Sequence, residues 1–513
     1  MIRQLIAKLL PVALLGLVAG CATNPVTGKS EFMVVSEAQE LELGKQNYAP
    51  MQQAEGGVYD VDPALTQYVQ RVGDKLAAVS DRPLPYEFVV LNNSVPNAWA
   101  LPGGKIAINR GLLTELNSEA ELAAVLGHEI VHAAAKHSAK QMSRGVFLQG
   151  AVLATAVMTG GSDFGDYAVG SAAAGAQLLN STYGRSAELE SDRYGMTYMS
   201  RAGYDPSGAI TLQETFVRLS EGQESDWLSG LFASHPPSQS RVDANVRTAA
   251  SLPAGGVLGV ESFEAAMQET RAALPAYEAH DEGRKALADK KYDEALALAN
   301  KAIEQFPDEA NFYALRGDVR QANETYDKAV TNYDSAIRRR DNYFYYYLQR
   351  GISKHEMGKT DSAVSDLERS NDLLPTAPAH YTLGNIESDR GNVDAAIDHY
   401  KIVAPAGGDY GKAASAKLVM LDLPRNPADY IPYRCDADSG GNLVVSVKNE
   451  TPVDIRDVRF VVTYTDNVGI QRQLRKQVSG RIPANEIRSV ATGLGPYNGA
   501  TCPVTIVAAE LAD

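Results

Sequence analysis

ELAAVLGHEIVHAAAKH, residues 121–137, is an apolar, alanine-rich segment with helical spacing and two histidines four residues apart. On a helix, His128 and His132 project from one face about one turn apart, so both imidazoles can bind one cation. Glu129 lies beside them, where a carboxylate can accept a proton from water. Imidazole and carboxylate ligands with one open position are typical of catalytic zinc. The segment therefore predicts a zinc site on a helix.

A second segment supplies the further ligand that such a site needs. YGRSAELESD, residues 183–192, places Glu188 and Asp192 four residues apart. On a helix one of these carboxylates can bind the metal while the other hydrogen-bonds a ligand or the reacting groups. Glu190 is expected to point elsewhere. A solvated acidic helix face is the ordinary interpretation of such a run, and the histidine pair favours a ligand instead.

Together these segments resemble the HExxH zinc metallopeptidases typified by the CAAX prenyl endopeptidase and the mitochondrial stress protease. The resemblance covers about residues 35–250, and its other matching stretches are Asn97–Gly104, Arg110–Leu113, Ser234–Pro237 and Arg241. It implies a zincin-like α+β domain, mainly helical, with one zinc ion per chain. It further implies that His128, His132 and Glu188 bind the zinc and that Glu129 is the general base.

Further roles follow from the same resemblance. Asp192 is expected to be a proton donor or to orient a ligand, and Asn97 and Arg241 to contact substrate or the ligands. His235 resembles a histidine that approaches the metal, either to stabilise the oxyanion or to block the open position; a structural histidine before Pro236 is the alternative. His137, five residues after His132, falls off the ligand face of a continuous helix and is interpreted as structural.

Two segments are interpreted as parts of the substrate cleft. The strand-like run at 105–109 predicts an edge strand along which a substrate peptide lies, with Ile106 and Ile108 as contacts. The apolar run VFLQGAVLATAVM, residues 146–158, is too short to span a bilayer and predicts a buried helix or a lid that continues through 168–178. A membrane-surface contact is the alternative for this run.

The N-terminus predicts export. Residues 1–20 carry Arg3 and Lys8, then an apolar core, then small residues, as in a secretory signal. LVAGC, residues 17–21, resembles the bacterial lipobox, which predicts lipidation at Cys21, and Ala22 favours the outer membrane. An ordinary cleaved signal with an incidental cysteine is the alternative.

Length and charge limit the remaining possibilities. At roughly 100–200 residues per domain, a chain of 513 residues predicts several domains. Its 48 basic against 63 acidic residues give a net charge of −15, which disfavours nucleic acid as a partner. We therefore expect no nucleic-acid partner.

The second half of the chain begins with helical repeats. Glycines recur at intervals of 34, 34 and 33 residues, each followed twelve residues later by an alanine: Gly283, Gly317, Gly351 and Gly384, then Ala295, Ala329, Ala363 and Ala396. The period resembles the tetratricopeptide repeat, whose solenoids bind peptides or partner proteins. The aromatic run at 343–347 is interpreted either as ligand contacts or as packing between helices.

After about residue 428 short alternating segments separated by turn residues predict a small antiparallel β-sandwich. If Cys21 carries lipid, the other two cysteines of the chain are Cys435 and Cys502. An even number of cysteines in an exported chain predicts a disulfide between them. Two buried thiols are the alternative. The expected domains are a signal (1–20), a lipid-anchored tether (21–35), a metallopeptidase (36–265), about four repeats (270–415) and the β-sandwich (428–513).

This order of domains is similar to that of the β-barrel assembly-enhancing proteases of the bacterial outer membrane, although the C-terminal β domain departs from it. The resemblance implies a zinc endopeptidase, anchored on the periplasmic side of the outer membrane, that cleaves unfolded or misassembled envelope proteins. Its expected partners are polypeptide substrates, the envelope assembly machinery through the repeats, and the membrane through the anchor. The alternative is a chaperone or scaffold with a mostly latent peptidase site.

Overall fold

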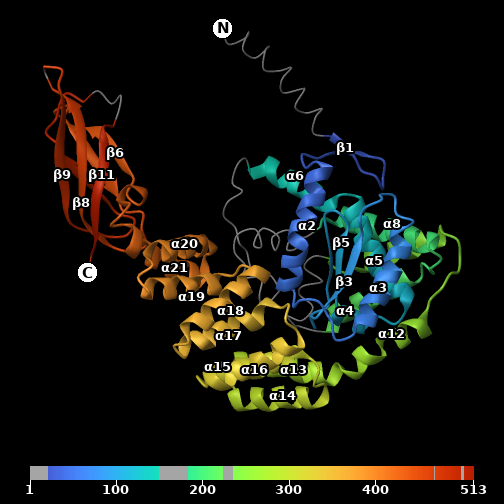
Figure 1. Cartoon of the computed structure of the whole chain (residues 1–513). Helices are drawn as coiled ribbons and strands as arrows, with labels where there is room; N and C mark the ends of the chain where they lie inside the picture. The colour runs from blue at the N-terminus through green and yellow to red at the C-terminus, as the bar shows by residue number, and fades with distance from the viewer. Residues whose placement is uncertain (1–20, 150–182, 223–234, 467, 498–501, 513) are drawn as a thin grey trace, which may run out of the picture. The chain divides into compact units, whose positions relative to one another are not determined.

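The computed structural model describes residues 21–149, 183–222, 235–466, 468–497 and 502–512 (Figure 1). The chain divides into two compact units, Met1–Pro375 and Thr376–Asp513. The predicted signal (1–20) and most of the predicted lid (146–178) lie outside the described residues. Within the described ranges no helix has both the length and the hydropathy needed to cross a membrane.

A three-stranded sheet lies at the centre of the first part of unit 1. Its strands are β3 (Glu87–Leu91), β4 (Ala98–Leu101) and β5 (Lys105–Asn109), in the order β3-β5-β4. Strand β5 runs parallel to β3 and antiparallel to β4. The predicted edge strand at 105–109 is therefore wrong: β5 is the central strand, and β4 is an edge.

Both faces of this sheet are covered, which explains the error. On one face Val89, Trp99 and Ala107 pack against Tyr48 and Met51 of α2 (Glu37–Ala54). The other face belongs to the larger hydrophobic core, together with α3 (Pro63–Ala77) and α5 (Glu119–Ala134). Figure 1 shows α2 on one side of β3 and β5 and α3 and α5 on the other. A strand covered on both faces is buried at every residue. The alternation of residue types within 105–109 therefore does not mark an exposed side of the strand.

Helices complete this part of unit 1. The Ser36 side chain caps α2 and forms a capping box with Gln39. Among the described residues the further helices are α4 (Arg110–Glu115), α6 (His137–Gln149), α8 (Arg185–Arg201), α9 (Gly208–Gly222), α11 (Gln239–Ala250) and α12 (Val260–Ala272).

The predicted tether is ordered in its described part. Strands β1 (Cys21–Thr23) and β2 (Ser30–Phe32) pair as an antiparallel hairpin. Asn24 is fully buried and donates to Glu190 Oε1 at 3.1 Å. The stretch assigned to the tether is thus a hairpin, and its polar residues bond to the helices beside it, as Glu31 also does with Lys140.

The repeats form antiparallel helix pairs at the predicted period. In unit 1 these are α13 (Leu274–Ala288) with α14 (Tyr292–Gln305), α15 (Ala310–Ala322) with α16 (Tyr326–Arg339), and α17 (Phe344–Glu356) with α18 (Thr360–Leu373). Unit 2 begins with α19 (Ala377–Asp389), α20 (Val393–Val403), η3 (Ala404–Ala406) and α21 (Gly408–Asp422). A Cβ atom at Gly317 would lie 2.7 Å from the Tyr333 ring, so the repeated glycine leaves room for a ring of the paired helix.

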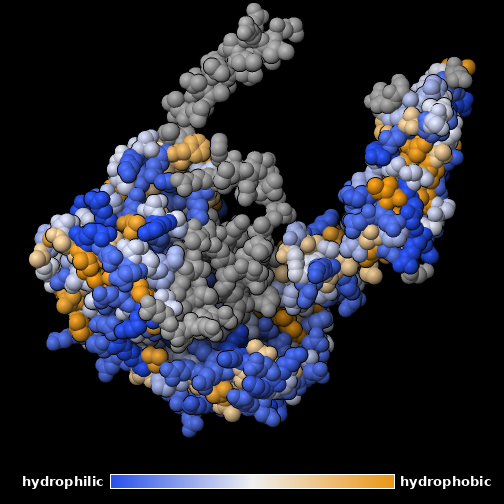
Figure 2. Space-filling model, turned by 180° about the vertical axis from the view of Figure 1, so that it is seen from behind, coloured by the Kyte–Doolittle hydropathy of each residue, from blue (hydrophilic) through white to orange (hydrophobic). Residues whose placement is uncertain are grey.

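The end of unit 2 consists of two three-stranded antiparallel sheets. One has the order β10 (Ile487–Ala491), β7 (Leu443–Lys448), β6 (Tyr433–Ala437), and the other β11 (Val504–Leu511), β8 (Ile455–Thr465), β9 (Gln471–Ile482); η4 (Pro427–Asp429) precedes them. The two sheets share one hydrophobic core. Cys435 of β6 and Cys502 before β11 form a disulfide with Cα atoms 5.5 Å apart. The face of the molecule in Figure 2 is mostly hydrophilic, with hydrophobic residues scattered over it.

Candidate metal centre

Helix α5 carries both histidines of the predicted motif and is buried along its whole length. Its start is fixed by Ser118, whose Oγ accepts from the Glu121 backbone N–H at 3.1 Å. Because α5 lies in the middle of the core, His128 and His132 cannot swing into solvent. Their positions are therefore set by the packing of the domain.

Helix α8 brings the acidic residues to the histidines. A Cβ atom at Gly195 would lie 3.0 Å from the carbonyl carbon of Gly127 and 3.0 Å from the His128 backbone nitrogen. The two helices thus touch backbone to backbone, as only glycine allows. This close approach places Glu188 and Asp192, on the preceding turns of α8, beside His128 and His132.

Four buried side chains converge at this point: His128, His132, Glu188 and His235. One ligand atom from each lies within 4.8 Å of all the others. The Nε2 atoms of His128 and His132 are 2.9 Å apart. Glu188 Oε1 lies 3.4 Å from His132 Nε2, and Glu188 Oε2 lies 3.5 Å from His128 Nε2. His235 Nδ1 lies 3.1 Å from Glu188 Oε1 and 3.3 Å from His128 Nε2.

The partners of the outer ring nitrogens assign the tautomers of the two α5 histidines. His128 Nδ1 lies 2.9 Å from Asp192 Oδ1, so it donates and leaves a lone pair on Nε2. His137 Nε2 lies 3.3 Å from Glu190 Oε1, which makes His137 Nδ1 the acceptor for His132 Nδ1 at 3.0 Å. His132 Nε2 therefore also carries a lone pair. Two lone pairs that face each other need a cation between them, so the donor set fits a metal ion.

Charges around the centre favour an ionised ligand set. Burial opposes the ionisation of Glu188, but the facing His235 and His128 outweigh it and lower the pKa of Glu188 well below its usual value. Burial lowers the pKa of His132 well below its usual value, so its imidazole is neutral. Burial opposes the protonation of His235, but Glu188 and Glu129 raise its pKa. An ionised Glu188 beside the neutral imidazole of His132 is a ligand pair of the kind that zinc binds.

Arg241 of α11 holds Asp192 in place. Its Nε donates to Asp192 Oδ2 and its Nη2 to Asp192 Oδ1, both at 2.7 Å. Its Nη1 also lies 3.0 Å from Glu188 Oε2. Burial opposes the ionisation of Asp192, but Arg241 outweighs it and lowers the pKa of Asp192. Both carboxylate oxygens of Asp192 therefore act as acceptors.

Glu129 lies next to the four ligands without joining them. Its Oε1 is 3.6 Å from His235 Nε2, and its buried Oε2 has no hydrogen-bond partner among the described residues. Burial raises the pKa of Glu129 above its usual value. A cavity of about 40 Å³ opens beside Glu129, and apolar side chains such as Met196 and Phe216 line it. An unpaired carboxylate oxygen beside a small cavity is suited to accept a proton.

Some predicted site residues lie elsewhere. Ile106 and Ile108 are fully buried in the central strand, so they cannot contact a substrate, and that prediction is wrong. Asn97 immediately precedes the edge strand β4, and its carbonyl oxygen accepts from the Asn109 backbone N–H at 2.8 Å. Its buried side-chain oxygen has no partner within the described ranges. Ala98, the next residue, lines the cavity beside Glu129.

Sequence reasoning missed the part that His137 and Glu190 play. Helix α5 ends at Ala134, and Lys136 has a φ of 60°, so the chain turns and His137 points back at His132. The expectation that His137 falls off the ligand face assumed a continuous helix. No residue type in this stretch marks the turn, because lysine is unusual in the left-handed conformation.

Comparisons with known proteins agree with this geometry. Residues 63–249 match the model of peptidase family M48. The β-barrel assembly-enhancing protease of Escherichia coli (strain K12) is 28% identical over 251 residues, covering 47% of this chain and 51% of that protein. The mitochondrial metalloendopeptidase OMA1 of Arabidopsis thaliana is 32% identical over 195 residues, covering 35% of this chain and 36% of that protein. The metalloprotease YcaL of E. coli is 31% identical and covers 31% of this chain and 59% of that protein. The matched regions thus span about a third to three fifths of these relatives.

Among solved structures, the Arabidopsis OM64 TPR domain aligns with a TM-score of 0.23 and 17% identity, covering 23% of this chain and 98% of that chain. The repeats are identified here by their period and helix pairs. The predicted fold class is confirmed: a mainly helical α+β domain that matches the model of peptidase family M48, helical repeats and a C-terminal all-β region. Zinc, the metal that M48 metallopeptidases use, is the cofactor that the four buried ligands fit.

Proposed function

We propose that this chain is a zinc-dependent endopeptidase, because residues 63–249 match the model of peptidase family M48. The observation that carries the proposal is the convergence of His128, His132, Glu188 and His235 beside the unpaired oxygen of Glu129. Zinc held by these residues would polarise a peptide carbonyl and activate water for attack on it. The side chains around the metal position the ligands and transfer protons.

Glu129 acts as the general base in this proposal. Its Oε2 has no competing donor among the described residues, so it is free to take a proton and pass it to the leaving amine. Asp192 is a positioning residue, because Arg241 and His128 already occupy both of its oxygens. It fixes the tautomer of His128. The alternative role of Asp192 as proton donor is disfavoured by the same contacts.

His235 supports a second candidate, a peptidase that is closed at rest. Its Nδ1 lies among the ligand atoms, so a metal bound by all four residues would have no open position. Catalytic zinc sites keep one position for water or substrate, and closed sites are structural. His235 must therefore leave the centre before a peptide can be cleaved. In the closed form the repeats would act as a scaffold or chaperone.

Cleavage of casein by purified residues 22–513 tests both candidates, with zinc measured on the same sample. Glu129→Gln is expected to abolish cleavage and leave the zinc content near one per chain. If His235 closes the site, His235→Ala is expected to raise the cleavage rate at unchanged zinc content. Cleavage that survives Glu129→Gln would show that Glu129 is not the base.

We propose that the chain works at the periplasmic side of the bacterial outer membrane, anchored by lipid on Cys21. The signal-like residues 1–20 and the similarity to β-barrel assembly-enhancing proteases support this location. The disulfide between Cys435 and Cys502 also favours an oxidising compartment. Labelling with a palmitate analogue tests the anchor, since Cys21→Ser should abolish the label and release the protein from membranes.

The proposed substrates are unfolded or misassembled envelope proteins, which the repeats would present to the peptidase domain. The repeats would also bind the envelope assembly machinery. Trapping with the Glu129→Gln variant tests this proposal, because captured proteins can be identified by mass spectrometry. Capture that is equally strong after deletion of residues 270–415 would rule out presentation by the repeats.

A further inference from the structure

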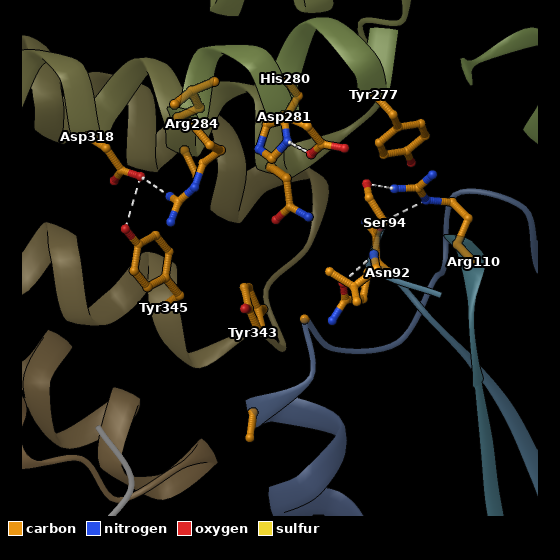
Figure 3. Close-up of a pocket in the computed structure, with 17 residues that line it drawn as sticks. Asn92, Ser94, Arg110, Tyr277, His280, Asp281, Arg284, Asp318, Tyr343 and Tyr345 are labelled. Carbon is orange, nitrogen blue, oxygen red and sulfur yellow. Dashed lines mark hydrogen bonds and ion pairs between the residues drawn. The ribbon is translucent and has the colours of Figure 1, made fainter. Parts of the chain in front are cut away.

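A larger cavity, of about 290 Å³, lies between the peptidase domain and the repeats within unit 1. The loop at 92–95, which follows β3, and Arg110 at the start of α4 form one wall. Helices α13 and α15 and the first turn of α17 form the other. Figure 3 shows the side chains of both walls pointing toward a common space.

Buried contacts fix the two walls to each other. Glu309, which is fully buried at the start of α15, accepts from Asn92 Nδ2 at 2.8 Å and from Tyr277 OH at 2.5 Å. The Arg110 guanidinium carbon lies 3.4 Å from the centroid of the Tyr277 ring. The cavity is thus preorganised, and its lining needs both the peptidase domain and the repeats.

The carboxylates of the cavity already have donors. Asp318 accepts from Arg284 Nη1 at 3.0 Å, from Tyr345 OH at 2.9 Å and from Tyr333 OH at 2.8 Å. Asp281 Oδ1 lies 2.9 Å from His280 Nδ1. Dashed lines in Figure 3 mark several of these contacts. A cationic ligand would therefore find no free carboxylate here.

Donors, in contrast, remain. Arg110 is 3% exposed, yet its side chain donates only to neutral groups among the described residues, Asn92 Oδ1 at 3.3 Å and Ser94 Oγ at 2.6 Å. Across the part of the chain that the structure describes, its Nη1 has no hydrogen-bond partner, and no carboxylate lies within ion-pair distance of it. The Oδ1 of Asn311 accepts from Tyr346 OH at 2.5 Å, while its Nδ2 has no partner in the same ranges. A buried guanidinium without a direct counter-ion and an unused amide donor call for an anionic acceptor.

We propose that this cavity binds a carboxylate group of a polypeptide. Arg110 and Asn311 donate to its oxygens, because the planar guanidinium matches the two oxygens of a carboxylate. Tyr343 and Tyr345, which line the same cavity, pack against the neighbouring residue of the peptide. The choice of a polypeptide rests on the proposed peptidase function. The carboxylate belongs to the C-terminus or to an aspartate or glutamate side chain.

Peptide retention by the full mature chain tests this proposal. The Glu129→Gln variant of residues 22–513 is mixed with decapeptide pools, separated by size exclusion, and the retained peptides are quantified by mass spectrometry. One pool has free C-termini and no acidic residues, a second has amidated C-termini with acidic residues, and a third has neither carboxylate. We expect retention of the first or second pool and none of the third, and the difference between the first two identifies the source of the carboxylate.

Two arginine variants provide the contrast. Arg110→Gln should weaken retention about tenfold, which corresponds to about 1.4 kcal/mol. Arg316→Gln is the matched control, because Arg316 lies on α15 outside the cavity and binds Asn332 and Asn300. Equal retention of all three pools, or full retention by Arg110→Gln with a normal melting temperature, would overturn the proposal.

Binding is measured without cleavage, so a failure of the proposed peptidase function leaves this result interpretable. Casein cleavage that fails while carboxylate-dependent retention holds would leave the cavity assignment standing. If the enzyme cleaves casein but retains the three peptide pools equally, the cavity does not bind carboxylates and the proposed peptidase function still stands.

Discussion

His137 Nδ1 lies 3.0 Å from His132 Nδ1, and His137 Nε2 lies 3.3 Å from Glu190 Oε1. A carboxylate thus acts on a proposed zinc ligand through a second imidazole. The chain of contacts fixes the tautomer of His132 and directs its Nε2 lone pair at the metal centre. His137 is therefore a positioning residue.

Replacement of His137 should weaken zinc binding without removing a ligand. His137→Leu removes the acceptor for His132 Nδ1 and is expected to lower zinc affinity by about 10- to 100-fold. His137→Gln retains an acceptor oxygen and should lose less. Zinc affinity measured by competition with a chelating dye checks both variants. Equal affinity of His137→Leu and the unchanged protein would show that His137 only fills space.

Loss of Arg241 should destabilise the peptidase domain. Arg241→Gln leaves the buried Asp192 and Glu188 carboxylates without their shared cation, which is expected to cost about 3 kcal/mol. Arg201→Gln is the control, because the Arg201 side chain is 48% exposed in its pair with Asp81 and should cost less than about 1 kcal/mol. Calorimetry of the metal-free protein measures both. A melting temperature for Arg241→Gln equal to that of Arg201→Gln would contradict the assignment.

A single methyl group between α5 and α8 should reduce zinc occupancy. Gly195→Ala places a Cβ atom 3.0 Å from the backbone of Gly127 and His128, so the helices must separate. We expect less than one zinc per chain after dialysis against a weak chelator. Gly184→Ala, where a Cβ atom meets nothing within 4 Å, should keep full occupancy. Full zinc content in Gly195→Ala would show that the helices adjust without moving the ligands.

The stability of unit 2 should fall in mild acid. Burial, and then the facing His399 at 3.0 Å, lower the pKa of His380 to about 4. Because the unfolded chain protonates this group near pH 6.5, the stability is complete above that pH and is lost as the pH falls toward 4. At 1.36 kcal/mol per unit the loss is at most about 3 kcal/mol.

His380→Gln should remove much of this pH dependence, measured by thermal unfolding between pH 4 and 8. The matched control is His355→Gln, a histidine of α17 in unit 1. If the slope between pH 4 and 6.5 is the same in His380→Gln and the unchanged protein, other groups cause the loss.

The sequence was sufficient wherever a pattern is local. The spacing of His128 and His132 predicted their shared face, and the repeated glycines predicted helix pairs such as that at Gly317 and Tyr333. It failed where the outcome depends on what covers a segment. Strand β5 was predicted to be an edge strand because nothing in the sequence of residues 105–109 indicates that α2 covers it. His137 points back at His132 because a single residue, Lys136, has a left-handed backbone conformation. The residue types of this stretch do not predict that conformation.

Asn24 is the last member of the contact chain that starts at His132, since its amide donates to Glu190. It lies three residues after Cys21, and three residues of extended chain span at most about 11 Å. If Cys21 carries acyl chains, this three-residue connection is too short for the peptidase domain to move away from the membrane. The catalytic domain would then sit on the lipid surface itself, and the proteins within its reach would be those that emerge at the membrane.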